Sequence, residues 1–122
     1  MWKKIKGGIA VEEIKVGDFV RTKEGIIDKI DAFNINTNIY HCENGLCIDK
    51  ENKIAVALKD IKHSKNIIDL VECGDYVNGK YVKEINQYKD GKSIIALIGI
   101  IDEQDIKTIL TKEQFEQNLY KV

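Results

Sequence analysis

Two histidines and three cysteines are the residues of this chain that could bind a metal ion or carry thiol chemistry: His41, Cys42, Cys47, His63 and Cys73. Zinc prefers thiolate and imidazole ligands, often with a Cys-x-x-Cys pair on a tight turn. Here four residues separate Cys42 from Cys47, and the neighbours His41 and Cys42 would point to opposite faces of a strand. We expect no metal and no disulfide, with a structural zinc site and a Cys42–Cys47 disulfide as the open alternatives.

The sequence carries no recognisable set of catalytic residues. Gly7-Gly8 precedes a predicted strand rather than a helix, so it does not predict a phosphate-binding loop. His63 and Ser64 are neighbours in sequence, which does not indicate a nucleophile and its base. Paired carboxylates such as Asp102-Glu103 are typical of a solvated edge. We therefore expect a protein that is not an enzyme and that uses no cofactor.

A few residues are better suited to binding than to catalysis. Arg21 is the only arginine and could grip a carboxylate or a phosphate, with an ordinary surface charge as the alternative. Trp2, the only tryptophan, is either an exposed binding anchor or a lid on the core. Small barrels bind peptides or nucleic acids through exposed aromatic rings. The candidate binding residues are Arg21, Tyr40, His63, Tyr76 and Trp2.

The charge balance narrows the class of partner. The net charge is −1 with positive and negative residues interleaved, which disfavours a dedicated duplex-DNA binder. The odd number of cysteines argues against a secreted disulfide framework. No apolar run is long enough to span a bilayer, and the basic N-terminus lacks the apolar core of a signal peptide. We expect a cytoplasmic protein without membrane contact.

These residues must be positioned by short strands, because one pattern occurs twice. Residues 14–20 contain Gly17-Asp18 followed by an aromatic residue and Val, and residues 71–77 repeat the pattern with Gly74-Asp75, 57 residues later (74 − 17). Residues 26–30 then match 81–85, and 60–62 match 105–107. This predicts a mainly β protein, a tandem duplication of a small SH3-like β-barrel-type unit, with units at 1–67 and 68–122 that share one core.

Local signals predict individual elements. The Gly-Asp pairs predict a bulge or tight turn, in which Asp18 and Asp75 bind nearby backbone N–H groups rather than act as catalytic acids. Asn44-Gly45 predicts a hairpin between strands 38–42 and 46–49 that places Cys42 opposite Cys47. The apolar run 93–101 predicts one central strand buried on both faces. Thr111, with Gln114 three residues later, predicts a helix over 112–119.

Residues 62–79 (KHSKNIIDLVECGDYVNG) and 109–115 (ILTKEQF) resemble small accessory proteins carried on phages and prophages of clostridia and related Firmicutes. The resemblance implies a genomic setting inside a bacterial host and transfers no functional residues. We therefore expect a non-enzymatic phage-encoded binding protein, an inhibitor of a host defence system of the anti-CRISPR type or similar, that binds a protein component. The alternative is a small β-barrel protein that binds a nucleotide signal or a nucleic acid.

Overall fold

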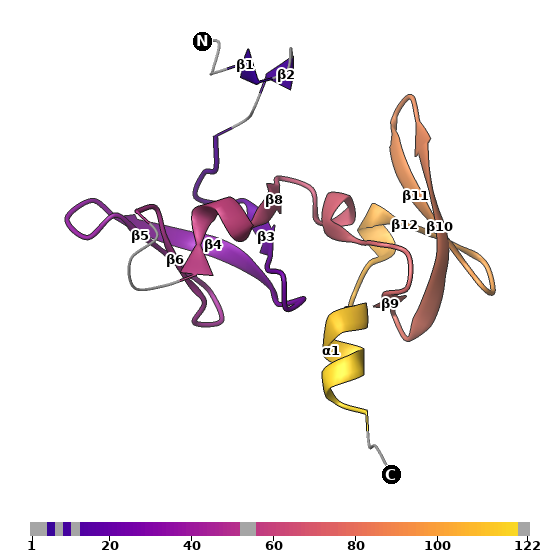
Figure 1. The fold of residues 1–122 in the computed structure, drawn as a ribbon. Helices are drawn as coiled ribbons and strands as arrows, with labels where there is room; N and C mark the ends of the chain where they lie inside the picture. The colour runs from indigo at the N-terminus through magenta and orange to yellow at the C-terminus, as the bar shows by residue number, and fades with distance from the viewer. Residues whose placement is uncertain (1–4, 7–8, 11–12, 52–55, 120–122) are drawn as a thin grey trace.

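The computed structural model describes residues 5–6, 9–10, 13–51 and 56–119. The chain is mainly β, as predicted, with two sheets of which one curls into a half-barrel. The sheets lie on either side of the short helix α1 (Lys112–Gln117), and a separate hairpin is formed by β1 (Ile5–Lys6) and β2 (Ile9–Ala10) (Figure 1). Among the residues described, no helix is long and apolar enough to cross a membrane.

The first sheet has the strand order β7-β6-β5-β4-β3-β8, with antiparallel neighbours except for the parallel pair β6–β7. Buried residues recur at every second position, at Asp28 and Ile30 on β4 and at Tyr40 and Cys42 on β5, which is the period that a sheet with one covered face requires. Its elements are β3 (Phe19–Arg21), β4 (Ile27–Asn34), β5 (Ile39–Cys42), β6 (Cys47–Asp49), β7 (Val56–Ala57), the 3-10 turn η1 (Leu58–Asp60) and β8 (Lys62–Ser64).

The second sheet has the order β12-β11-β10-β9-β13 and is antiparallel throughout. The prediction of one strand over 93–101 is wrong, because the run turns back on itself at Gly99, whose φ is +89°. The elements are the 3-10 turn η2 (Ile67–Leu70), β9 (Tyr76–Val77), β10 (Lys80–Tyr88), β11 (Gly91–Ala96), β12 (Ile100–Asp102), the 3-10 turn η3 (Glu103–Asp105) and β13 (Ile109–Leu110).

The predicted C-terminal helix is confirmed and is two residues shorter than expected. The side chain of Thr111 caps its N-terminus by accepting a hydrogen bond from the Gln114 backbone N–H at 3.3 Å. The helix ends at Gln117, where the amide of Asn118 bonds back to carbonyl groups of the last turn. The sequence signal therefore placed the start of the helix correctly.

The first Gly-Asp pair forms a tight turn before β3. Gly17 has φ +98°, and its N–H donates to the Ile30 carbonyl at 2.9 Å, while the Ile30 N–H donates to the Asp18 carbonyl at 2.9 Å. The Asp18 carboxylate accepts the Lys15 N–H at 3.1 Å, which confirms the predicted backbone role of this acid.

The second pair makes the same bonds before β9. Gly74 has φ +96°, its N–H donates to the Val82 carbonyl at 3.0 Å, and the Val82 N–H donates to the Asp75 carbonyl at 2.8 Å. The Asp75 carboxylate accepts the Glu72 N–H at 2.8 Å. The two turns therefore occupy matching positions: each precedes one strand and hydrogen-bonds to the next, β4 in the first sheet and β10 in the second.

The matching turns also correct the alignment of the strands that follow. The sequence pattern aligned residues 26–30 with 81–85. The hydrogen bonds of the two turns instead make Ile30 the positional equivalent of Val82. A one-residue irregularity follows at the same place in both sheets, between Ile30 and Ala32 and between Val82 and Glu84. The comparison failed because the connection after β3 is longer than the connection after β9.

The Asn44-Gly45 hairpin exists, but its register differs from the prediction. The Gly45 N–H donates to the Cys42 carbonyl at 3.1 Å, and the Cys42 N–H donates to the Leu46 carbonyl at 2.9 Å. The loop therefore has three residues, with Gly45 at φ +98° in its last position. As a result, Cys47 lies opposite His41 rather than opposite Cys42.

Among the described residues, the buried apolar side chains form two clusters rather than the single shared core that the sequence led us to expect. The first cluster is Ile14, Val20, Ile30, Tyr40, Cys42 and Ile48. The second is Ile68, Val71, Val77, Val82, Ile94, Ala96 and Ile101. Each sheet covers its own cluster, and polar groups join the two halves.

Candidate functional site

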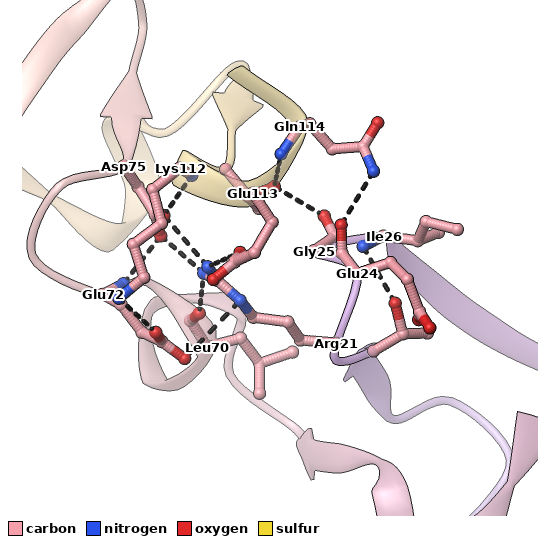
Figure 2. Close-up of polar contacts among 12 residues, drawn as sticks. Arg21, Glu24, Gly25, Ile26, Leu70, Glu72, Asp75, Lys112, Glu113 and Gln114 are labelled. Atoms are coloured by element: carbon pink, nitrogen blue, oxygen red, sulfur yellow. Dashed lines mark hydrogen bonds and ion pairs between the residues drawn. The ribbon is translucent and has the colours of Figure 1, made fainter. Parts of the chain in front are cut away.

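Arg21, at the end of β3, forms the main polar connection between the two sheets. Its guanidinium donates to both carboxylate oxygens of Asp75, with Nη1–Oδ2 at 2.5 Å and Nη2–Oδ1 at 3.0 Å. It also contacts the Leu70 carbonyl at 2.9 Å, Glu113 of α1 at 2.6 Å and Glu72 at 3.5 Å (Figure 2). We call this group of five residues the arginine clasp. Since Arg21 is only 2% exposed, the prediction of an ordinary surface charge is wrong.

Glu72 of the arginine clasp also forms ion pairs with two lysines. Glu72 pairs with Lys62 and with Lys112, both at 2.8 Å. Burial raises the pKa of Glu72, but hydrogen bonds from the two lysines and the charge of Arg21 outweigh burial and lower it to about 2. For Arg21, burial alone would lower the pKa, because it disfavours the charged guanidinium. The hydrogen bonds to Asp75 and Glu113 outweigh burial and raise the pKa above its usual value. Both shifts favour the charged forms of Arg21 and Glu72 at neutral pH.

Helix α1 contacts the connection between β3 and β4 through polar groups. The Thr111 hydroxyl donates to the Gly25 carbonyl at 2.7 Å, and the Gln114 side chain donates to the Glu24 carbonyl at 2.9 Å (Figure 2). The backbone N–H of Lys112 donates to Asp75 at 2.9 Å. The N-terminal end of the helix thus contacts both halves of the chain.

The strongest candidate for a binding surface lies on the outer face of the second sheet. Tyr76 lies directly opposite Tyr81 on β10 and Leu110 on β13, so the three side chains share one face. The neighbours Val77 and Val82 point into the core, which identifies this face as the outer one. Leu97 extends the row, because its N–H donates to the Tyr81 carbonyl at 3.2 Å.

The rings in this row are packed together but remain partly open to solvent. The Tyr76 ring meets Tyr81 edge-on at 5.6 Å between centroids, and Phe115 of α1 lies 5.0 Å from Tyr76. Leu97 is 69% exposed, and Tyr81, Leu110 and Phe115 are also exposed. We call the set formed by Leu97, Tyr81, Tyr76, Leu110 and Phe115 the outer row.

The first sheet presents a different surface at matching backbone positions. There, Phe19 follows the Gly-Asp turn as Tyr76 does, and it lies opposite Lys29 and Ser64. Glu43 donates its N–H to the Lys29 carbonyl at 2.9 Å, just as Leu97 bonds to Tyr81. The first sheet therefore carries Glu43, Lys29, Phe19 and Ser64 where the second carries Leu97, Tyr81, Tyr76 and Leu110. The backbone accepts polar residues at these sites, so the apolar side chains are not required to build the sheet.

The structure separates the candidate binding residues predicted from sequence. Tyr76 lies in the outer row. Arg21 uses its donors inside the clasp, and Tyr40, at 6% exposed, packs with Phe33 in the first core. The ring of Tyr40 is thus core, not surface. Trp2 lies outside the described residues.

His63, on β8, is half-buried and anchored by a charged neighbour. Its Nδ1 lies 3.0 Å from the Asp18 carboxylate, so Asp18 has a ring partner where Asp75 has Arg21. Of the other thiol and imidazole residues, Cys42 is buried, Cys47 is half-buried and Cys73 is exposed, all as free thiols. In the part of the chain that the structure describes, no three His, Cys, Asp or Glu side chains form a metal cluster.

The candidate binding residues predicted from sequence include only one of the five residues of the outer row, Tyr76. Leu97 and Leu110 are common aliphatic residues in predicted strands, and nothing local marks them as exposed. Aligning the two sheets by the hydrogen bonds of their turns reveals the contrast, because it sets Lys29 against Tyr81 and Glu43 against Leu97. No protein-family model, curated protein or solved structure matches this chain.

Proposed function

We propose that this chain is a non-enzymatic binding protein that contacts a partner protein through the outer row of its second sheet. The contrast between the two sheets carries the proposal. Matching positions hold Lys29 and Glu43 in one sheet and Tyr81 and Leu97 in the other, although the polar set would build the same backbone. Contiguous exposed apolar side chains on a small protein mark an interaction surface, and tyrosine is enriched among residues that dominate binding energy.

We also infer that the two sheets are copies of one small SH3-like unit. The identical hydrogen bonds of the turns at Gly17 and Gly74, and the irregularities that follow them, support this inference. After duplication, one copy can keep a polar outer face while the other acquires a binding face. The arginine clasp then holds the second copy in a fixed orientation, which lowers the entropic cost of binding.

A protein partner fits the outer row better than a nucleic acid does. Binding to a phosphate backbone depends on lysine and arginine side chains that neutralise charge. The outer row contains neither, and the only arginine of the chain is held in the clasp. A nucleotide or nucleic-acid ligand remains the second hypothesis, and a steep loss of affinity with added salt would favour it.

The resemblance to phage and prophage proteins suggests where the partner is found. In that setting the partner is a protein of the bacterial host cytoplasm, and a component of a defence complex is the specific proposal. Blocking such a complex requires affinity and shape but no chemistry, which agrees with a surface of rings and aliphatic side chains.

Affinity capture from a prophage-bearing clostridial host tests this proposal. The bait is wild-type protein, and the row variant Tyr81→Lys/Leu97→Glu carries the residues that the first sheet has at these positions. The matched control, Lys29→Ala/Glu43→Ala, changes the same two positions of the first sheet. We expect one host protein to be captured by wild type and by the control and to be lost with the row variant. Equal capture by all three would overturn the proposal.

A further inference from the structure

His41 and Cys47 form a pair of metal-ligand side chains on the outer face of the first sheet. They lie directly opposite each other on β5 and β6, with Cys47 Sγ 3.6 Å from His41 Nδ1. His41 is exposed and Cys47 is half-buried, while the intervening Cys42 points into the core. The sulfur also lies 3.8 Å from the Gly45 carbonyl, in the loop that sets the register of this pair.

The separation of the two donor atoms matches the geometry of a zinc site. Zinc binds cysteine sulfur at about 2.3 Å and histidine nitrogen at about 2.0–2.1 Å in a tetrahedral arrangement, which places the two donors about 3.5 Å apart. The observed 3.6 Å therefore requires almost no movement of either side chain. Because the sheet fixes both strands, the two donors are already oriented before a metal arrives.

The sheet itself does not require this pair. In the second sheet, the strand after the matching irregularity places Glu84 opposite Ile95, and Ile95 opposite Ile100. The first sheet has Ala32, His41 and Cys47 in that order. Two isoleucines therefore occupy the positions in the second sheet that His41 and Cys47 occupy in the first. The strand pairing does not depend on the histidine and the cysteine.

One chain supplies only half of a zinc coordination shell. Within the described ranges, no third or fourth His, Cys, Asp or Glu joins His41 and Cys47. Structural zinc sites are four-coordinate, commonly with two cysteines and two histidines. A second copy related by a two-fold axis would present the same two donors and complete the set.

We propose that His41 and Cys47 form a half-site for Zn²⁺, and that one zinc ion bridges two copies of this chain through a Cys₂His₂ site. Binding displaces the thiol proton of each Cys47 to solvent. The bridge pairs the first sheets of two molecules and leaves the second sheets free. The inference stands on the geometry of β5 and β6 alone and does not rest on the proposed function.

The test uses the full-length, fully reduced protein, with Zn²⁺ added in titration and sedimentation experiments. We expect one zinc ion per two chains and a zinc-dependent dimer that EDTA dissociates. With Co²⁺ as the probe, the visible spectrum should show the intense bands of tetrahedral thiolate coordination. A monomer at all zinc concentrations, or one ion per chain without dimer formation, would overturn the proposal.

Variants decide whether the pair is the site. Cys47→Ser and His41→Ala should each abolish the dimer and the cobalt spectrum. The variant His41→Ile/Cys47→Ile installs the side chains of the second sheet and should fold as wild type does while losing both signals. Cys73→Ser, which removes an exposed thiol elsewhere, should leave both unchanged. Zinc-dependent dimers that persist without His41 and Cys47 would show an adventitious ion only and contradict the inference.

Discussion

Arg21 and Asp75 form a buried bidentate ion pair that joins the first sheet to the second, although the two residues are 54 positions apart in sequence. Both side chains are almost completely shielded from water, at 2% and 0% exposed. Such a pair is favourable only if the geometry is good and the remaining donors and acceptors are satisfied. Here the Glu72 and Lys112 backbone N–H groups complete the shell of Asp75.

Replacing Arg21 with Met should destabilise the protein strongly, because it leaves Asp75 as a buried charge without its cation. Breaking a buried pair in this way costs about 3–5 kcal/mol of unfolding free energy. Urea denaturation followed by circular dichroism measures the loss. The control is Lys23→Met, since Lys23 pairs with Asp60 at 73% exposure and should change stability by less than about 0.5 kcal/mol. A loss below about 1 kcal/mol for Arg21→Met would contradict the account of the clasp.

Gly17→Val and Gly74→Val should each destabilise the fold by about 1–3 kcal/mol, because a β-branched residue resists a positive φ. A Cβ atom at Gly17 would meet nothing within 4 Å, so the cost there is conformational rather than steric. Gly17→Asn should cost less, since asparagine tolerates left-handed backbone. Differential scanning calorimetry provides the comparison, and unchanged melting temperatures for both valine variants would refute the equivalence of the two turns.

Stability should fall in acid partly through Glu72. Its pKa is about 2 in the folded protein, below the usual value for glutamate, so between these values the unfolded chain binds more protons than the folded one. Its contribution is therefore complete above about pH 5 and is lost as the pH falls toward 2, with a total of about 2 kcal/mol after allowance for partial exposure. Urea midpoints between pH 7 and pH 3 measure the slope, which should be shallower in Glu72→Gln. An identical slope in the two proteins would exclude this role.

The three thiols should react at very different rates with iodoacetamide. Burial raises the pKa of Cys42 to about 12, and the thiolate is the reactive form, so Cys42 should stay unmodified in the folded protein. Cys73 is exposed and should react first, followed by half-buried Cys47. Peptide mass spectrometry at timed intervals gives the order, and in denaturant the three rates should converge. Early modification of Cys42 in native protein would contradict the burial of this thiol in the first core.

Local patterns in the sequence predicted the parts of the fold that depend on neighbouring residues. The doubled Gly-Asp pair indicated two tight turns, and Thr111 with Gln114 marked the start of the helix. The prediction of one strand over 93–101 is wrong because a continuous apolar run does not distinguish one buried strand from two strands with a turn at Gly99.

The connections between the halves could not be predicted in the same way. Arg21 meets Asp75 and Glu113 across 54 and 92 residues, and no local pattern records a contact over such distances. Charged groups of the clasp join the two halves, and the buried apolar residues described lie in two clusters rather than one. The outer row was missed for a related reason, since the exposure of Leu97 depends on how the whole sheet folds.

The outer row is the proposed contact surface for the partner, and a binding measurement with the purified partner tests this role directly. Isothermal titration should be run with wild type, with Tyr81→Lys/Leu97→Glu and with Lys29→Ala/Glu43→Ala, after circular dichroism has shown that all three are folded. Loss of central contact residues at an interface costs about 2 kcal/mol or more, so the first variant should weaken binding at least about 30-fold. The first-sheet variant should stay within about threefold of wild type. Wild-type affinity in the folded Tyr81→Lys/Leu97→Glu protein would contradict the claim that the second sheet carries the binding surface.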